Sequence, residues 1–271
     1  MTLQSHYLQA RFVWSNDMKK ILNRSQLKFI ALAFMIFDHI QIYLAGDVLP
    51  RWTTWLARFV ALLFVYLLVE GFYKTTNRAA YLKRIIYAAL LTWSGEILIN
   101  LMWHHVDPIT HHFTIYSLLS GNNILVTLAL FLGIMWSLYS FQQNYKHWWY
   151  LCLTIILSLT SLIFEGGIYL LPLLFIFYCF YNKVNYQIIG ILIICGLILA
   201  HAIYNAWLLH INLYEMLTFD NEWMMVTVIP FILLYNGQKG HVTFLTKHLF
   251  YVIYPVHLWI LMITGYLLGT I

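Results

Sequence analysis

The chain has 271 residues, of which 62% are hydrophobic and only 9% are charged. Soluble globular proteins carry charge on roughly a quarter of their residues, so this composition excludes an ordinary soluble fold and indicates a membrane protein. The net charge of +5 does not indicate nucleic-acid binding, because the Lys and Arg residues stand between apolar runs, where they report membrane topology.

The apolar runs predict an all-α polytopic bundle of about nine spanning helices, because a span needs roughly 17 to 25 mostly apolar residues. Residues 1–26 are expected to form a cytoplasmic N-terminal segment, and residues 27–271 a single transmembrane domain. The sixth and eighth segments are short, so each is expected to be tilted, broken or buried in the bundle. The nine segments are 27–45, 53–73, 80–102, 123–141, 147–164, 168–182, 186–205, 222–236 and 247–269.

The distribution of positive charge predicts a cytoplasmic N-terminus and an outside C-terminus. With this orientation Arg51 lies in an outside loop and Arg58 within the second helix, while every other Lys and Arg falls on the cytoplasmic side. The two long outside loops, 103–122 and 206–221, contain no Lys or Arg. The expected location is therefore the bacterial cytoplasmic membrane, with lipids as partners and no nucleic acid.

The first helix contains an ionisable pair, Asp38 and His39, within an apolar run. Lys28 precedes His39 by eleven residues, which is three helical turns and about 16 Å along the axis. One interpretation is a catalytic histidine deep in the bundle with a lysine near the cytoplasmic surface. The other is a structural Asp–His pair with a snorkelling lysine, and the sequence favours neither.

The second and third helices also carry charge. Arg58 lies inside the second helix, where a guanidinium needs an anion or several carbonyl groups, and Glu70 lies near its cytoplasmic end. Glu96 lies within the third helix, so an Arg58–Glu96 ion pair is the structural alternative to a functional role.

Three further polar positions occur in the later helices. Asn122 and Asn123 begin the fourth helix, where the side chain of one of them can cap the N-terminus. Glu165 precedes two glycines in a short outside turn, where it contacts an acceptor substrate or simply faces water. Pro255 kinks the ninth helix two residues before His257, which lies at a depth similar to that of His39.

Neither the histidines nor the cysteines indicate a metal site. The loop 103–122 contains four histidines, but their spacing matches no specific site, so no metal is expected. The three cysteines all lie in apolar segments and are expected to be small buried side chains rather than disulfides or ligands. These residues are His104, His105, His111, His112, Cys152, Cys179 and Cys195.

An ordered set of segments from about residue 26 to residue 265 resembles the TraX family. The segments read QLKFIALAFMIFDHI, LARFVALLFVYLLVEGFYKTTNRAAYLKRI, NNILVTLAL, EGGIYLLPLLFIFY, LLYNGQKG and FYVIYPVHLWIL. TraX proteins are polytopic membrane proteins, and the founding member acetylates the N-terminal amine of a conjugative pilin with acetyl-CoA. The resemblance thus implies a membrane acetyltransferase that uses acetyl-CoA as acyl donor, and a transmembrane acyltransferase-like domain over residues 27–271.

The TraX family is similar to the wider transmembrane acyltransferases, which carry an Arg or Lys and then, after ten intervening residues, a histidine on the first helix. Lys28 and His39 have ten residues between them, so the resemblance implies a catalytic role for His39 and an acyl-donor contact for Lys28. One departure concerns Glu165, where the family often has Asp, and it leaves the acceptor open.

These inferences give three expected groups of site residues. The catalytic group contains His39 as general base, with Asp38 or a nearby polar group to fix its tautomer and Arg58 or an Asn amide to stabilise an oxyanion. An acetyl-histidine intermediate remains the alternative to direct transfer. The expected groups are His39, Asp38, His257 and Arg58 for catalysis; Lys28, Glu70, Lys74, Arg78 and Arg84 for the donor; and Glu96, Asn123 and Glu165 for the acceptor.

The acceptor is expected to be an amine or hydroxyl on a pilin-like peptide, a surface glycan or a lipid-linked sugar. Two other functions fit the same buried charges. A transporter or flippase would use them to line a permeation route, although the sequence contains no evident inverted repeat. A non-catalytic assembly protein would use them only to hold helices together.

Overall fold

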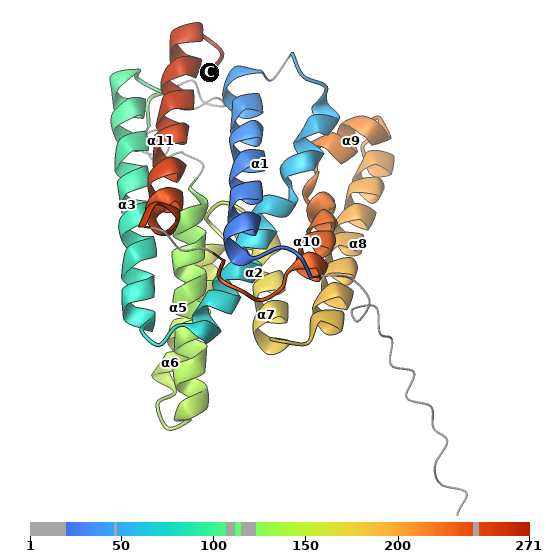
Figure 1. Cartoon of the computed structure of the whole chain (residues 1–271). Helices are drawn as coiled ribbons and strands as arrows, with labels where there is room; N and C mark the ends of the chain where they lie inside the picture. The colour runs from blue at the N-terminus through green and yellow to red at the C-terminus, as the bar shows by residue number, and fades with distance from the viewer. Residues whose placement is uncertain (1–19, 46–47, 107–111, 115–122, 241–243) are drawn as a thin grey trace, which may run out of the picture.

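The computed structural model of this chain is an all-helical bundle (Figure 1). Outside the helices, the described part contains one isolated bridge, between Leu22 and Tyr235. The structure describes residues 20–45, 48–106, 112–114, 123–240 and 244–271. The elements are α1 (Arg24–Leu44), η1 (Arg51–Ala57), α2 (Phe59–Lys74), α3 (Arg78–Met102), α5 (Ile124–Gln143), α6 (Trp149–Ser161), α7 (Gly167–Cys179), α8 (Val184–Leu208), α9 (Leu213–Phe219), η2 (Glu222–Val228), α10 (Ile229–Leu234) and α11 (Phe244–Leu268).

Each of the nine predicted apolar segments contains a helix, but the count of nine spans is not confirmed. Six helices in the described part are long and apolar enough to cross a membrane, and a bent pair, α9 with η2–α10, makes up to seven. The helices α6 and α7 have 13 residues each, which is about 20 Å at 1.5 Å per residue and short of a full span.

The central helix of the bundle is α2, and α1, α5, α7 and η2 all pack against it. Its sequence is apolar on nearly every side, which is the pattern of a helix surrounded by protein. In the most apolar part of the span Arg51–Lys74, which η1 and α2 form together, 72% of the residues are buried, compared with 28% in the peripheral α8. The polar side chains that α2 carries therefore lie inside the bundle.

Most positive charges of the described chain lie at one end, which we call the basic end. It contains the start of α1 and the connections α2–α3, α5–α6, α7–α8 and α10–α11, in the lower half of Figure 1, while the C-terminus lies at the top. The prediction of a cytoplasmic N-terminus depends on this clustering of Lys and Arg at one end of the bundle. Its cations include Arg24, Lys28, Lys74, Arg78, Arg84, Lys146, Lys183 and Lys239.

The start of α1 is fixed by a capping box that joins Asn23 and Gln26. The Asn23 side chain accepts from the backbone N–H of Gln26 at 3.0 Å, and the Gln26 side chain accepts from the backbone N–H of Asn23 at 2.9 Å. The helix consequently begins at Arg24, three residues before the predicted boundary, and this brings Arg24 into the basic end.

The turn between α6 and α7 depends on two glycines. Gly166 has φ of +69°, a conformation that glycine adopts without strain. A Cβ on Gly167 would lie 1.7 Å from the carbonyl oxygen of Ser161. The two helices can therefore approach closely only because neither position carries a side chain, and this holds Glu165 in place.

We expect Gly167→Ala to lower the thermal unfolding midpoint of the detergent-solubilised protein, because the backbone of Ser161 must move to admit the new methyl group. Gly196→Ala is the matched control: a Cβ at this α8 position meets nothing within 4 Å. It should be neutral or stabilise by up to about 1 kcal/mol. Equal midpoints for the two variants would contradict the close approach at Gly167.

Candidate functional site

Two buried histidines from opposite ends of the chain meet in the middle of the bundle. The Nδ1 atom of His39 on α1 lies 2.9 Å from the Nε2 atom of His257 on α11. The Nδ1 atom of His257 lies 2.8 Å from the carbonyl oxygen of Ile253. The two histidines therefore lie at similar depth, as expected, and are in direct contact.

The hydrogen bonds assign the tautomers of both rings. A carbonyl oxygen only accepts, so Nδ1 of His257 carries a hydrogen and donates to Ile253. In the neutral ring Nε2 of His257 is then an acceptor, and Nδ1 of His39 must donate to it. This leaves Nε2 of His39 unprotonated, which is the state a general base requires.

Asp38 pairs with Arg58 instead of fixing the tautomer of His39. The Nη2 atom of Arg58 lies 2.8 and 2.7 Å from the two carboxylate oxygens of Asp38, and Nε donates to the carbonyl of Thr54 at 3.3 Å. The predicted alternative of an Arg58–Glu96 pair is therefore wrong. Sequence reasoning missed this pair because nothing in one sequence aligns the depth of α1 with that of η1.

These groups border a central cavity of about 180 Å³. Its wall contains Asp38, His39 and Arg58 together with two further carboxylates, Glu165 and Glu222. Glu165 is exposed to solvent. It also lines this cavity, so its turn is part of the candidate site and not a separate surface feature. The central cavity thus combines a neutral histidine, one guanidinium and three carboxylates.

Glu96 and Asn123 lie near this site, and both have buried side-chain oxygens without a hydrogen-bond partner among the described residues. Glu96 has no exposed surface, and neither carboxylate oxygen has a hydrogen-bond partner among the described residues. Asn123 stands at the N-cap position of α5 but makes no capping bond; its amide nitrogen donates to the carbonyl of Ala89 at 3.0 Å. Asn123 is therefore not the residue that caps α5, and Asn122 lies outside the described residues.

A second, basic cavity of about 340 Å³ opens at the basic end. Five cations and no acidic side chain line it within the described chain, while its inner wall is apolar. Three of these cations, Lys28, Lys74 and Arg84, are among the predicted donor residues. The five are Arg24, Lys28, Lys74, Arg84 and Lys239.

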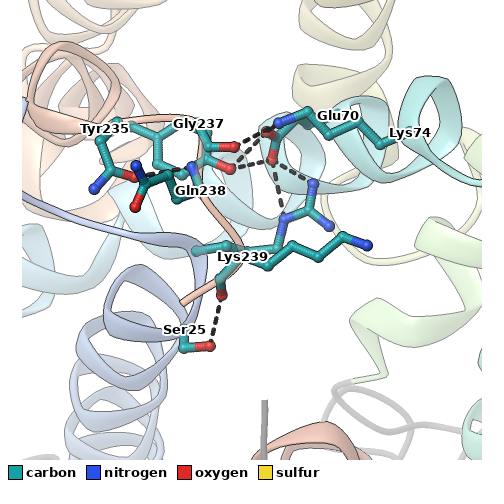
Figure 2. Close-up of polar contacts among 9 residues, drawn as sticks. Ser25, Glu70, Lys74, Tyr235, Gly237, Gln238 and Lys239 are labelled. Carbon is teal, nitrogen blue, oxygen red and sulfur yellow. Dashed lines mark hydrogen bonds and ion pairs between the residues drawn. The ribbon is translucent and has the colours of Figure 1, made fainter. Parts of the chain in front are cut away.

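Glu70 holds the rim of the basic cavity together (Figure 2). Its carboxylate accepts from Arg24 and Lys74, each at 2.5 Å, and from the Tyr235 hydroxyl at 2.5 and 2.6 Å. Burial and the hydrogen bond to Glu70 raise the pKa of Tyr235, so this phenol stays protonated as a donor. Glu70 therefore positions two cations of the cavity without lining the cavity itself.

The same hub fixes the segment that presents Lys239. Lys74 donates to the carbonyl of Gly237 at 2.6 Å, and the Ser25 hydroxyl donates to the carbonyl of Lys239 at 2.9 Å (Figure 2). Gly237 and Gly240 have φ of +76° and +75°, which favours glycine at both positions. The sequence analysis did not assign Arg24 or Lys239 to the donor site. For Lys239, the flanking glycines in NGQKG were the signal in the sequence that could have indicated it.

Arg78 does not join the predicted donor group. Its guanidinium carbon lies 4.0 Å from the ring centroid of Tyr139 and 4.6 Å from that of Phe72, an arrangement typical of cation–π contacts. It is absent from the residues that line the basic cavity. Arg78 therefore packs α3 against α2 and α5.

The cysteines are free, and the described residues contain no group of three His, Cys, Asp or Glu arranged to hold a metal. Cys195 is buried as expected, but Cys179 is exposed and Cys152 partly so. His111 lies outside the described residues.

Comparisons with known proteins agree with the resemblance drawn from the sequence. The family model described as TraX protein matches residues 23–264. A Dichelobacter nodosus protein named "Probable fimbrial assembly protein FimC, serogroup H1" is 28% identical over 250 residues, which cover 87% of this chain and 93% of that protein. No solved structure matches the chain. With nearly its whole bundle matched by the family model, this chain belongs to the TraX family.

Proposed function

We propose that this protein transfers an acetyl group from cytoplasmic acetyl-CoA to an acceptor on the other side of the bacterial cytoplasmic membrane, with His39 as general base. The observation that carries the proposal is the order of the two cavities. The basic cavity opens at one end of the bundle, the central cavity contains His39, and the side chain of Phe64 lines both.

The basic cavity fits the donor. Coenzyme A carries several phosphate charges, and five cations with no lining carboxylate provide a matching site. Lys28 and His39 lie on α1 about 16 Å apart along its axis. A donor whose phosphates bind near Lys28 can therefore extend its pantetheine arm toward His39, with the thioester as its leading end.

The tautomer of His39 fits direct transfer. A neutral amine of the acceptor attacks the thioester carbonyl while Nε2 of His39 takes the proton that the amine loses. Collapse of the tetrahedral intermediate breaks the carbon–sulfur bond, and the leaving thiolate takes that proton from His39. The products are an N-acetylated acceptor and coenzyme A, and a hydroxyl acceptor would give an ester by the same steps.

Arg58 is the group best placed to stabilise the oxyanion. Its Nη2 and Nε atoms donate to Asp38 and Thr54, while Nη1 donates to no acceptor among the described residues. A guanidinium has five N–H donors, so the Nη1 pair is left for a substrate oxygen. Asp38 then holds Arg58 in position and balances its charge.

The acceptor class that we favour is the amine of a pilin-like peptide. The D. nodosus relative carries a name that refers to fimbrial assembly. The carboxylates of Glu165 and Glu222 in the central cavity favour a cationic or hydrogen-bond-donating acceptor over an anionic one. Surface glycans and lipid-linked sugars are the alternative acceptors.

Calorimetric titration of acetyl-CoA into the purified protein tests the donor site. Wild-type protein should bind, and Lys28→Ala should weaken binding by about tenfold, because one charge-assisted contact contributes about 1.5 kcal/mol. Lys146→Ala is the matched control, since Lys146 is exposed at the α5–α6 turn and outside the cavity. No affinity of the folded wild type for any acyl-CoA would refute the donor assignment.

A further inference from the structure

The two cavities lie one after the other along the same faces of α1 and α2. On α2 the lining side chains recur every three or four residues, as one face of a helix does. On α1 the lining passes without a gap from Lys28 and Leu32 in the basic cavity to Met35 and His39 in the central cavity. These residues are Ala57 at the end of η1 with Val60, Ala61 and Phe64 of α2 in the central cavity, then Phe64, Leu67, Leu68, Gly71 and Lys74 in the basic cavity.

The side chain of Phe64 lies where the two cavities meet. Within the described chain it is the one residue that lines both cavities, and it is only 5% exposed. Its ring centroid lies 4.7 Å from that of Phe250 on α11, which also lines the basic cavity. The Nζ atom of Lys28 lies 6.0 Å from the Phe250 ring, on the basic side. The paired rings therefore stand between the cations and His39.

We infer that Phe64, backed by Phe250, is the partition in a single donor path and sets the size of the acyl group that reaches His39. The inference rests on the proposed function. The phosphates of the donor stay with the cations, so the acyl group must pass Phe64 first. An acetyl group needs a small displacement of the ring, whereas a longer acyl chain needs a larger one against well-packed neighbours.

Acyl-chain selectivity provides the first test. The ratio of kcat/KM for butyryl-CoA to kcat/KM for acetyl-CoA should rise at least about tenfold in Phe64→Ala and less in Phe64→Leu, which keeps more of the side-chain volume. Phe59→Ala and Phe59→Leu are matched controls, because buried Phe59 packs on Phe34 and Phe231 and lines neither cavity. An unchanged ratio in an active Phe64 variant would overturn the inference.

Thiol access provides a second test that needs no catalysis. A cysteine introduced by Ala61→Cys lies in the central cavity, beyond Phe64 from the basic end. In a background without the native cysteines, a hydrophilic thiol reagent added at the basic end should react with it at least about tenfold faster when Phe64→Leu or Phe64→Ala is also present. Phe59→Leu should leave the rate unchanged. Equal rates with and without Phe64 would show that the ring is no partition.

The two tests separate this inference from the proposed function. If the wild type transfers no acyl group from any acyl-CoA, the proposed function fails, while the thiol reaction still decides whether Phe64 divides the path. If acetyl transfer occurs but neither the acyl ratio nor the thiol rate depends on Phe64, the partition alone fails.

Discussion

Replacing His39 by glutamine should lower acetyl transfer by about 100- to 10,000-fold, the usual contribution of a positioned general base. Glutamine is similar in size and can keep a hydrogen bond to His257, but it cannot take a proton. Acetyl-CoA affinity should stay close to that of the wild type, because His39 lies in the central cavity and not among the cations. Radiolabelled acetyl-CoA consumption and calorimetry measure the two quantities.

His201→Gln is the matched control for this substitution. His201 is exposed on α8 and contacts Asn205 and Asp220, away from both cavities. Its replacement should leave transfer unchanged. The double variant His39→Gln/His257→Gln should be no slower than His39→Gln alone, because His257 acts by fixing the tautomer of His39. A folded His39→Gln variant with wild-type transfer would exclude His39 as the base.

Arg58→Ala should cause the largest combined loss of stability and activity. It leaves the Asp38 carboxylate uncompensated in the bundle, which costs about 3 kcal/mol for a buried ion pair and less at this partly exposed one. It also removes the proposed oxyanion contact, so transfer should fall by about 100-fold or more. Thermal unfolding in detergent and transfer assays measure the two effects.

The double substitution Asp38→Asn/Arg58→Gln separates these effects. It removes both charges together, so most of the lost stability should return. Transfer should remain low, since no guanidinium faces the central cavity. Full recovery of transfer in the double variant would show that Arg58 serves only to neutralise Asp38.

The sequence predicted the class of fold because apolar run length and the placement of Lys and Arg are local properties of the chain. All nine apolar segments contain helices, and the connections at the basic end carry the expected charges. The number of full spans is not confirmed, because helix length depends on tertiary packing, which apolar run length does not contain. The helix α7 stops at Cys179, and α6 ends at Ser161 against the backbone of Gly167.

The sequence pointed to most residues of the candidate site but not to their hydrogen-bond and ion-pair partners. Intramembrane charge pointed to Asp38, His39, Arg58 and His257, and all four lie at or beside the central cavity. Their partners depend on how helices distant in sequence align in depth, which a single sequence does not contain. Glu70 shows the same limit. The sequence predicts that it contacts the donor, whereas in the structure its carboxylate accepts hydrogen bonds from Arg24 and Lys74 at the rim of the basic cavity.

Acetyl transfer in membrane vesicles of defined orientation tests the central claim most directly. Radiolabelled acetyl-CoA is added to inverted and to right-side-out vesicles that contain the wild type or His39→Gln, with a peptide amine on the opposite side. The proposed mechanism predicts labelled peptide only when acetyl-CoA meets the cytoplasmic face of the wild type. Labelling that is equal in His39→Gln, or no labelling and no thioester consumption by folded wild-type protein, would contradict it.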